Sequence, residues 1–169
     1  SWDKTVRVWD AETGGALLVI DVGESVWALA FFVDPATGAP RLVTSSGKVF
    51  DPVAGGEGLL VLEGHTGFVK TLTVFVDPAT GTLRLASGST DNSVRIWDLA
   101  AGGAALLVLE GHAGSVTALT AFADPATGET RLASGSYDKT LRVWDASKGG
   151  AALRVVHSDD NVSALAVRS

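Results

Sequence analysis

Two sets of histidine, serine and aspartate recur in the sequence, and their residue types are those of a nucleophilic catalytic site. The sets are His65, Ser87 and Asp91, and His112, Ser134 and Asp138. In both sets the serine follows the histidine by 22 residues, and the aspartate follows the serine by 4. A serine activated by a histidine, which an aspartate orients, is the arrangement of serine hydrolases. An active site has no reason to recur at a fixed interval along a chain, so the repetition favours a structural role for both sets.

Other catalytic, metal or cofactor sites are not indicated by the residues present. The chain has no cysteine, which excludes thiolate zinc sites and cysteine nucleophiles. Its three histidines have no additional ligands at metal-binding spacing, and the Gly-Gly turns are not followed by the Lys-Ser/Thr of a phosphate loop. The acidic run 159–161 lacks the spacing of a calcium loop. We therefore expect no metal, no cofactor and no enzymatic activity.

Composition narrows the class of partner. The 169 residues are 46% hydrophobic and carry a net charge of −6, which is a globular composition with an anionic surface. An anionic chain gains little from binding phosphate backbones, so nucleic acid is not an expected partner. No apolar run is long enough to span a membrane and no signal peptide is visible, so no membrane association is expected. Cytoplasm is the default expectation for location. The absence of Met suggests a chain cut from a longer product or engineered.

The elements that would position the two sets are revealed by an internal repeat. The segment 84–98 reads RLASGSTDNSVRIWD and the segment 131–145 reads RLASGSYDKTLRVWD, 47 residues later. Half of the same pattern opens the chain as SWDKTVRVWD, and a shorter version, RLVTSSGKVFD, occupies 41–51. Repeats of this length indicate stacked structural units rather than one irregular domain.

Four types of short segment recur in fixed order within each unit, and each alternates side chains with the period of a β-strand. The first type comprises 26–33, 69–76, 116–123 and 162–167; the second begins at Arg41, Arg84 and Arg131; the third ends at Trp9, Phe50, Trp97 and Trp144; the fourth comprises 16–20, 58–62, 105–109 and 152–156. No segment sustains helical periodicity. The pattern predicts an all-β protein with 15 strands, in which four-stranded antiparallel units stack as the blades of a β-propeller.

These residues make the chain resemble the WD-repeat β-propeller family. The resemblance implies that each complete blade contains a buried hydrogen-bonded tetrad of His, Ser, Asp and Trp, which here is His65, Ser87, Asp91 and Trp97 in one blade and His112, Ser134, Asp138 and Trp144 in the next. In such a tetrad the buried polar groups satisfy one another. The family also implies a non-catalytic scaffold that binds protein or peptide partners.

Two units depart from the family pattern. The unit 25–62 has Phe50 in place of Trp, a turn four residues shorter with no Asp, and no His, so Thr44 alone remains of its tetrad. The first unit has Asp3 and Trp9 of a partial tetrad, for which His157 is a candidate third member, although no Gly precedes it. We expect the unit 25–62 to depend on packing alone.

The expected domain is a single half propeller over 1–169. Its blades are 25–62, 68–109 and 115–156, with an incomplete blade formed by 1–22 and 162–168. Because an open half ring exposes an edge and a blade face, one hypothesis is that two chains close an eight-bladed ring by self-association. The alternative is that the chain is a fragment of a larger propeller.

A partner-binding face is implied by the resemblance. Family partners dock where turns precede the first strand of each blade, called the inner strand, and where turns join the second and third strands. Carried over by position, these turns hold Ser25, Trp27, Phe68, Lys70, Ser115, Thr117, Asn161 and Ser163, with Trp2, Thr90 and Tyr137 beside the tetrad Asp positions. Aromatic residues are the favoured interface anchors. Alternatively, Trp27 belongs to the core, and Trp2 and Tyr137 only pack along a neighbouring blade. The sequence thus gives two functional hypotheses: a peptide-binding scaffold and a structural unit whose main property is ring closure.

Overall fold

The chain is a succession of short β-strands, as the period-two alternation of its side chains predicts. The computed structural model describes residues 1–77 and 79–166, which form fifteen strands and no helix, and therefore contain no helix that could cross a membrane. The strands are β1 Thr5–Trp9, β2 Ala16–Asp21, β3 Leu29–Val33, β4 Pro40–Thr44, β5 Lys48–Phe50, β6 Leu60–Glu63, β7 Val69–Val76, β8 Leu83–Ser89, β9 Val94–Asp98, β10 Gly103–Ala104, β11 Leu107–Leu109, β12 Val116–Ala123, β13 Thr130–Ser136, β14 Thr140–Asp145 and β15 Arg154–His157. The expected all-β class is confirmed.

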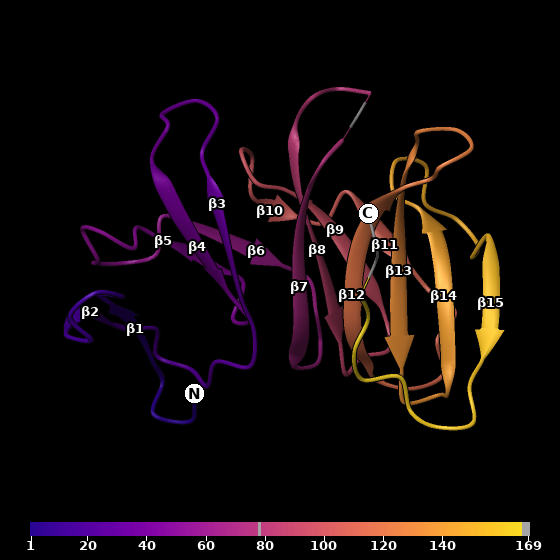
Figure 1. Ribbon diagram of the computed structural model, residues 1–169, viewed down its shortest axis with the longest axis horizontal. Coiled ribbons are helices and arrows are strands. Elements are labelled where there is room, and N and C mark those ends of the chain that lie inside the picture. Colours follow the sequence, from indigo (N-terminus) through magenta and orange to yellow (C-terminus); the bar gives the residue numbers. More distant parts are fainter. Residues whose placement is uncertain (78, 167–169) are drawn as a thin grey trace.

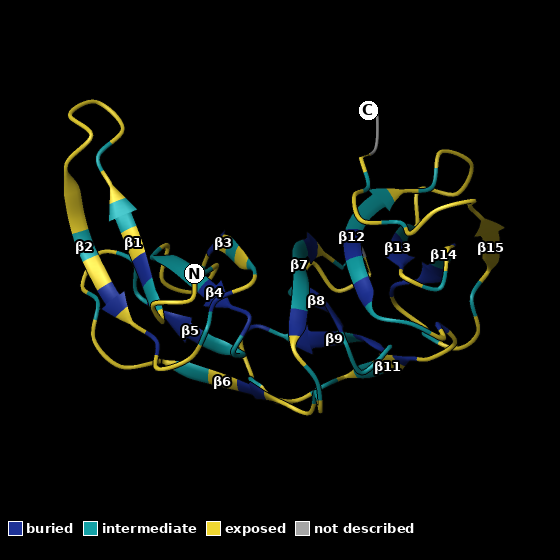
Figure 2. Cartoon of the chain, turned by 90° about the horizontal axis from the view of Figure 1, so that it is seen from below, coloured by how far each residue is buried: buried dark blue, intermediate teal, exposed yellow. Residues whose placement is uncertain are grey.

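The strands form four sheets that succeed one another along an arc, with β1 and β2 at one end and β15 at the other (Figures 1 and 2). Antiparallel neighbours follow chain order within each sheet: β1-β2, β3-β4-β5-β6, β7-β8-β9-β11 and β12-β13-β14-β15. The first strand of one sheet lies next to the first strand of the following sheet, since β7 contacts both β3 and β12. This radial arrangement is that of propeller blades.

The hydrophobic core lies between the blades, and each boundary between two neighbouring blades has its own cluster of buried side chains. One cluster joins Phe75 and Ile96 to Val116 and Trp144 of the next blade. A second joins Val43 and Val49 to Leu85 and Trp97, and a third joins Val6 and Ile20 to Val26 and Phe50. Both faces of these strands are apolar because each face is buried against a different neighbour.

Close approach between blades requires glycine at one repeated position. A Cβ atom at Gly88 would lie 2.6 Å from the Cγ1 atom of Val116, and one at Gly135 would lie 2.4 Å from the Cγ1 atom of Val162. Carbon atoms in contact are normally 3.5–4.0 Å apart, roughly, so only glycine fits there. Val162 therefore packs on its preceding blade as Val116 does.

The segment 162–167 was expected to be a strand, and this prediction is wrong for the described part, Val162–Ala166; Val167 lies outside the described residues. The segment has no second strand beside it to complete a ladder. Instead, the N–H of Val162 donates to the carbonyl of Ser136 at 3.1 Å, and its carbonyl accepts from Thr117 Oγ1 at 2.9 Å. The total of fifteen strands is reached through β10, which the sequence did not predict and which pairs in parallel with β6 of the preceding blade.

The blade 25–62, called the degenerate blade below, has a shorter first strand than expected. Strand β3 begins at Leu29 instead of Val26, because its partner β4 ends at Thr44 and the chain then turns back through Ser45. The residues before β3 are held individually instead, through bonds from the N–H of Trp27 to Ser45 Oγ and from the N–H of Ser45 to the carbonyl of Ala28. The fourth strands of the three full blades also start two residues later than predicted, at Leu60, Leu107 and Arg154.

Candidate functional site

The two histidine sets form closed hydrogen-bond networks with the tryptophans of the third strands. His65 Nδ1 lies 2.7 Å from Asp91 Oδ2, its Nε2 lies 2.7 Å from Ser87 Oγ, and Trp97 Nε1 donates to that oxygen at 2.8 Å. In the following blade the corresponding distances, for His112, Ser134, Asp138 and Trp144, are 2.9, 2.7 and 2.8 Å. Because each carboxylate can only accept, Nδ1 carries the proton and the serine hydroxyl donates to Nε2.

The protonation states follow from burial and hydrogen bonding. Burial lowers the pKa of His65 and of His112 below the ordinary value, outweighing the hydrogen bonds and charges of Asp91 and Asp138, which raise it. Burial opposes ionisation of both aspartates as well. Hydrogen bonds from Ser93 and His65 nevertheless lower the pKa of Asp91, and those from Thr140, Ala113 and His112 lower that of Asp138. Each network therefore holds a neutral imidazole against a carboxylate at neutral pH.

The serine hydroxyls are not placed to attack a substrate. Ser134 is 0% exposed and its oxygen is engaged by both His112 and the indole of Trp144. Ser87 is equally engaged and nearly as buried. The order Asp, His and Ser is that of a nucleophilic triad, but the geometry is that of two structural networks, each of which ties the second and third strands of a blade, and the turn between them, to the preceding loop.

Two further hydroxyls belong to these networks, and the sequence analysis missed them. Ser93 Oγ donates to Asp91 Oδ1 and Thr140 Oγ1 donates to Asp138 Oδ1, both at 2.7 Å. The same contact occurs between Thr5 and Asp3, at 2.9 Å. The signal was available in the sequence, since a Ser or Thr stands two residues after the aspartate in all three copies.

The partial tetrad is not assembled within one chain. Asp3 is exposed, and hydrogen bonds from Ser1 and Thr5 lower its pKa to about 2. Trp9 is also exposed on β1, at one end of the arc. His157 is exposed at the end of β15, at the opposite end (Figure 1).

The degenerate blade replaces its tetrad with local bonds. Thr44 is fully buried, and its Oγ1 lies 2.7 Å from Ser46 Oγ and 3.3 Å from the carbonyl of Lys48. Phe50 is buried in the place of the tetrad tryptophan. Gly23 stands at the position of the missing histidine, and among the described residues no hydrogen bond joins Gly23 to this turn. The turn is tied to the loop before β3 farther along the chain, through Trp27 and Ala28.

A repeated ion pair also escaped the sequence analysis. Arg131 Nη1 lies 3.0 Å from Asp145 Oδ2, Arg41 Nη1 lies 3.1 Å from Asp51 Oδ2, and Arg84 pairs with Asp98 in the same way. Asp145 also accepts the N–H groups of the turn after β14. In the three full blades, the aspartate that follows Phe50, Trp97 or Trp144 therefore clamps the second strand and the following turn.

Three exposed aromatic side chains converge on one face, and we name Trp2, Trp27, Phe68 and Lys70 the aromatic patch. The centroids of Trp2 and Trp27 are 4.8 Å apart at an interplanar angle of 72°, and those of Trp27 and Phe68 are 6.3 Å apart. Lys70 Nζ lies 3.2 Å from the centroid of the Trp27 ring. The exposed fractions are 78% for Trp2, 39% for Trp27 and 66% for Phe68, so Trp27 lies at the surface and not in the core.

The patch is positioned by backbone irregularities at the ends of the inner strands. Lys70 is the unpaired residue of a bulge between Val69 and Thr71, and bulges commonly redirect a side chain. Phe68 is fixed by Thr90, whose Oγ1 accepts its N–H at 2.8 Å and whose own N–H donates to its carbonyl at 2.9 Å. Thr90 thus fixes the backbone position of Phe68 in the patch.

Ser25 lies beside the patch, whereas Ser115, Thr117 and Tyr137 lie in the next blade and do not join it. Thr117 is the bulge residue of β12, and its hydroxyl donates to Val162. The carbonyl of Ser115 accepts the N–H of Tyr137, whose side chain is 55% exposed. Among the described residues, Tyr137 makes no pair with another aromatic ring.

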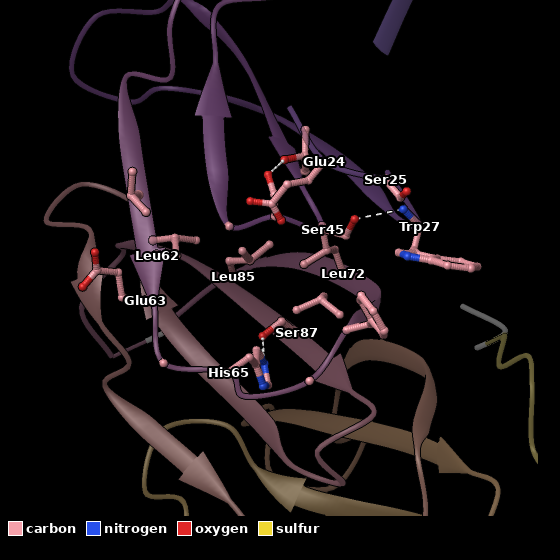
Figure 3. A pocket seen from close by; sticks show the side chains of 18 of the residues that line it. Glu24, Ser25, Trp27, Ser45, Leu62, Glu63, His65, Leu72, Leu85 and Ser87 are labelled. Carbon is pink, nitrogen blue, oxygen red and sulfur yellow. Dashed lines mark hydrogen bonds between the residues drawn. The ribbon is translucent and has the colours of Figure 1, made fainter. Parts of the chain in front are cut away.

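A cleft of about 580 Å³ opens beside the patch, between the degenerate blade and the blade 68–109 (Figure 3). Leu62, Leu72 and Leu85 line it, and Trp27 and Phe68 belong to both the cleft and the patch. His65 and Ser87 border it on the side of the complete blade, while Glu24 and Glu63 stand on its other sides (Figure 3). The degenerate blade contributes its short turn, 44–47, and Gly23, so the cleft lies where this blade lacks a tetrad.

Comparison with known proteins identifies the family. The sequence model of the family described as "WD domain, G-beta repeat" (WD40) matches residues 56–98 and 103–145, which is just over half of the chain. Each match ends at the aspartate of a Trp-Asp pair and includes one complete tetrad. No curated protein sequence matches the chain. The repeats, the blade topology and the family match together establish that the chain belongs to the WD40-repeat family.

Proposed function

We propose that this chain is a non-catalytic scaffold that binds a protein or peptide partner through the aromatic patch. WD40 repeats are protein-interaction scaffolds in general, and the patch supplies a specific face for that role. The observation that carries the proposal is the convergence of Trp2, Trp27 and Phe68, which come from three successive blades and remain exposed. The absence of catalysis is supported by the burial of the tetrad serines.

The physical basis is the energy of burying aromatic rings. Each ring offers a large apolar area, and burial contributes about 25 cal/mol per Å² of apolar surface removed from water. Contact between Trp2 and Trp27, and the ammonium of Lys70 on Trp27, limit the motion of the rings before a partner arrives. A rigid aromatic anchor loses little side-chain entropy on binding, which is why such residues dominate interface energies.

The test is partner recovery from a lysate of the source cells with wild-type chain and the double variant Trp2→Ala/Phe68→Ala. We expect the double variant to lose the bound protein, because removing one interface anchor costs about 2 kcal/mol or more, or roughly 30-fold in affinity. Val53→Ala, which removes a similarly exposed apolar side chain outside the patch, is the matched control. Equal recovery by wild type and the double variant would exclude this face.

The single variant Tyr137→Ala measures how far the binding face extends. Tyr137 occupies the position of Trp2 in a later blade but lies outside the patch. We expect it to reduce recovery much less than Trp2→Ala.

A second candidate function is self-association that closes a ring. It is favoured by the exposed apolar side chains on the two outermost strands of the arc, Leu17 and Val19 on β2 and Val155 and Val156 on β15 (Figure 2). Edge strands of this kind are open to pairing with another chain. Light scattering at micromolar concentration should then give a dimer that Val19→Glu dissociates, whereas a wild-type monomer would remove this candidate.

A further inference from the structure

The cleft beside the aromatic patch lies at a boundary where the degenerate blade lacks the residues of its tetrad. In the blade 68–109 the turn after the second strand contains four additional residues, 90–93, which carry Asp91 over His65. The degenerate blade turns directly through Ser45 and Ser46, and Gly23 stands where the histidine would be. The missing side chains leave a hollow whose floor is the apolar interior of the boundary.

The floor and the rim of the cleft differ in chemistry. Leu62, Leu72 and Leu85 form an apolar floor, and Glu24 and Glu63 lie on the exposed rim. Figure 3 shows the two carboxylates reaching out on different sides of Leu62 and Leu85. Within residues 1–77 and 79–166, neither Glu24 nor Glu63 takes part in an ion pair or a side-chain hydrogen bond.

We propose that the cleft binds an arginine or lysine side chain of the partner peptide. This inference rests on the proposed function, since it names the residue type that the partner presents beside the patch. A long basic side chain can lay its methylene stem on apolar surface while its charged head stays at the exposed rim. The leucine floor suits the stem, and the two unpaired carboxylates suit the head.

The charges around the cleft favour a cation over an anion. The lining contains two carboxylates and one ammonium, that of Lys4, and the whole chain carries a net charge of −6. Two further cations stand close to the cleft: the guanidinium of Arg95 lies against Gly64, and the ammonium of Lys70 lies on the ring of Trp27, which shows that this aromatic wall accepts an ammonium group. An acidic side chain would meet the two carboxylates of Glu24 and Glu63, against the single ammonium of Lys4 in the lining.

The experiment is an NMR titration of the full chain with three capped pentapeptides, Gly-Ala-X-Ala-Gly, in which X is arginine, norleucine or glutamate. The amide signals of Glu24 and Glu63 are followed. We expect arginine to bind roughly five- to tenfold more tightly than norleucine, because two partly exposed ion pairs each contribute a modest amount. We expect glutamate to bind most weakly. Raising the salt from roughly 0.05 M to roughly 0.5 M should weaken only the arginine peptide, since salt screens exposed charges.

The matched variants are Glu24→Gln/Glu63→Gln and Glu110→Gln. Glu110 precedes Gly111-His112 as Glu63 precedes Gly64-His65, but it does not line the cleft. The double variant should reduce arginine binding to the norleucine level, and Glu110→Gln should leave it unchanged. Equal binding of arginine and norleucine, no binding of any peptide, or an unaffected double variant would overturn the inference.

The two proposals fail in different ways. If partner recovery depends on Trp2 and Phe68 but not on Glu24 and Glu63, the scaffold proposal stands and the basic-anchor inference is wrong. If the arginine peptide binds at the cleft but the patch variant recovers its partner unchanged, the scaffold proposal fails while the cleft site remains.

Discussion

The two boundaries between full blades differ in what closes them. Between the blades 68–109 and 115–156, Val116 packs directly on Gly88, and a histidine network holds each of the two blades. Between the degenerate blade and the blade 68–109, the equivalent of Gly88 is Ser45, and no histidine network holds the degenerate blade. We call the first boundary sealed because of this close packing, while the second carries a cleft and the aromatic patch. In this chain, loss of a structural network and gain of a candidate binding surface occur at the same place.

The largest expected effect comes from a variant that disrupts the network of the blade 115–156, at the sealed boundary. Asp138→Ala leaves the Nδ1–H of His112 and the hydroxyl of Thr140 without their buried acceptor. We expect a loss of about 2–3 kcal/mol in the free energy of unfolding, measured by urea denaturation. Thr44→Val in the degenerate blade, which removes only local bonds, should cost no more than about 1 kcal/mol. The exposed substitution Asp159→Ala is the control, and equal losses for Asp138→Ala and Thr44→Val would show that the two blades do not differ in what stabilises them.

A second pair of variants tests the close packing at Gly88 and at its equivalent in the degenerate blade, Ser45. Gly88→Ala forces a Cβ atom to within 2.6 Å of Val116, and such overpacking should destabilise the chain by roughly 1–3 kcal/mol. Ser45→Ala at the equivalent position creates no such overlap and removes one bond, from the N–H of Trp27, at a cost of about 1 kcal/mol. Thermal unfolding measures both. If Gly88→Ala were as stable as wild type, close contact across the sealed boundary would not be a constraint.

The smallest expected effect is the dependence of stability on pH. Burial lowers the pKa of His65 and His112 in the folded state, so the unfolded chain binds more protons below its ordinary histidine pKa of about 6.5. Stability should therefore fall as the pH drops through that value. The lowered pKa of Asp91 and Asp138 continues this loss below about pH 4, where the unfolded carboxylates take up protons.

The measurement is urea unfolding at several pH values between about 7.5 and 5. His157→Gln, at an exposed position outside both networks, should keep the wild-type slope, whereas His112→Gln should flatten it. Stability that is constant or rises on acidification would contradict the neutral state assigned to the two histidines.

Much of the fold followed from repetition in the sequence. Strands β7 and β12 match their predicted bounds, because each carries an alternating pattern and has a full-length partner strand. The segments 26–28 and 162–166 carry the same pattern but are not strands. Alternation describes only which side chains could be buried. A strand also needs a neighbouring backbone, and the neighbour is a property of the whole arrangement.

The candidate site was only partly visible in the sequence. The positions of Trp2, Trp27, Phe68 and Lys70 were predicted as members of one face, but their mutual contact depends on a bulge at Lys70 and on the late start of β3. The cleft was not predicted, since it arises from side chains that are missing. The clamp between Arg131 and Asp145 could have been found from the constant separation of 14 residues, which recurs between Arg84 and Asp98.

The short strand β10 fixes the backbone on one side of the cleft. Gly103 and Ala104 pair with Leu62 and Glu63, so backbone from the end of one blade holds the strand that carries one rim carboxylate of the cleft. The backbone of Glu63 cannot move away from the floor without breaking this pairing. The backbone on this side of the cleft is therefore set before a ligand arrives, so that only the side chain of Glu63 remains to be ordered on binding.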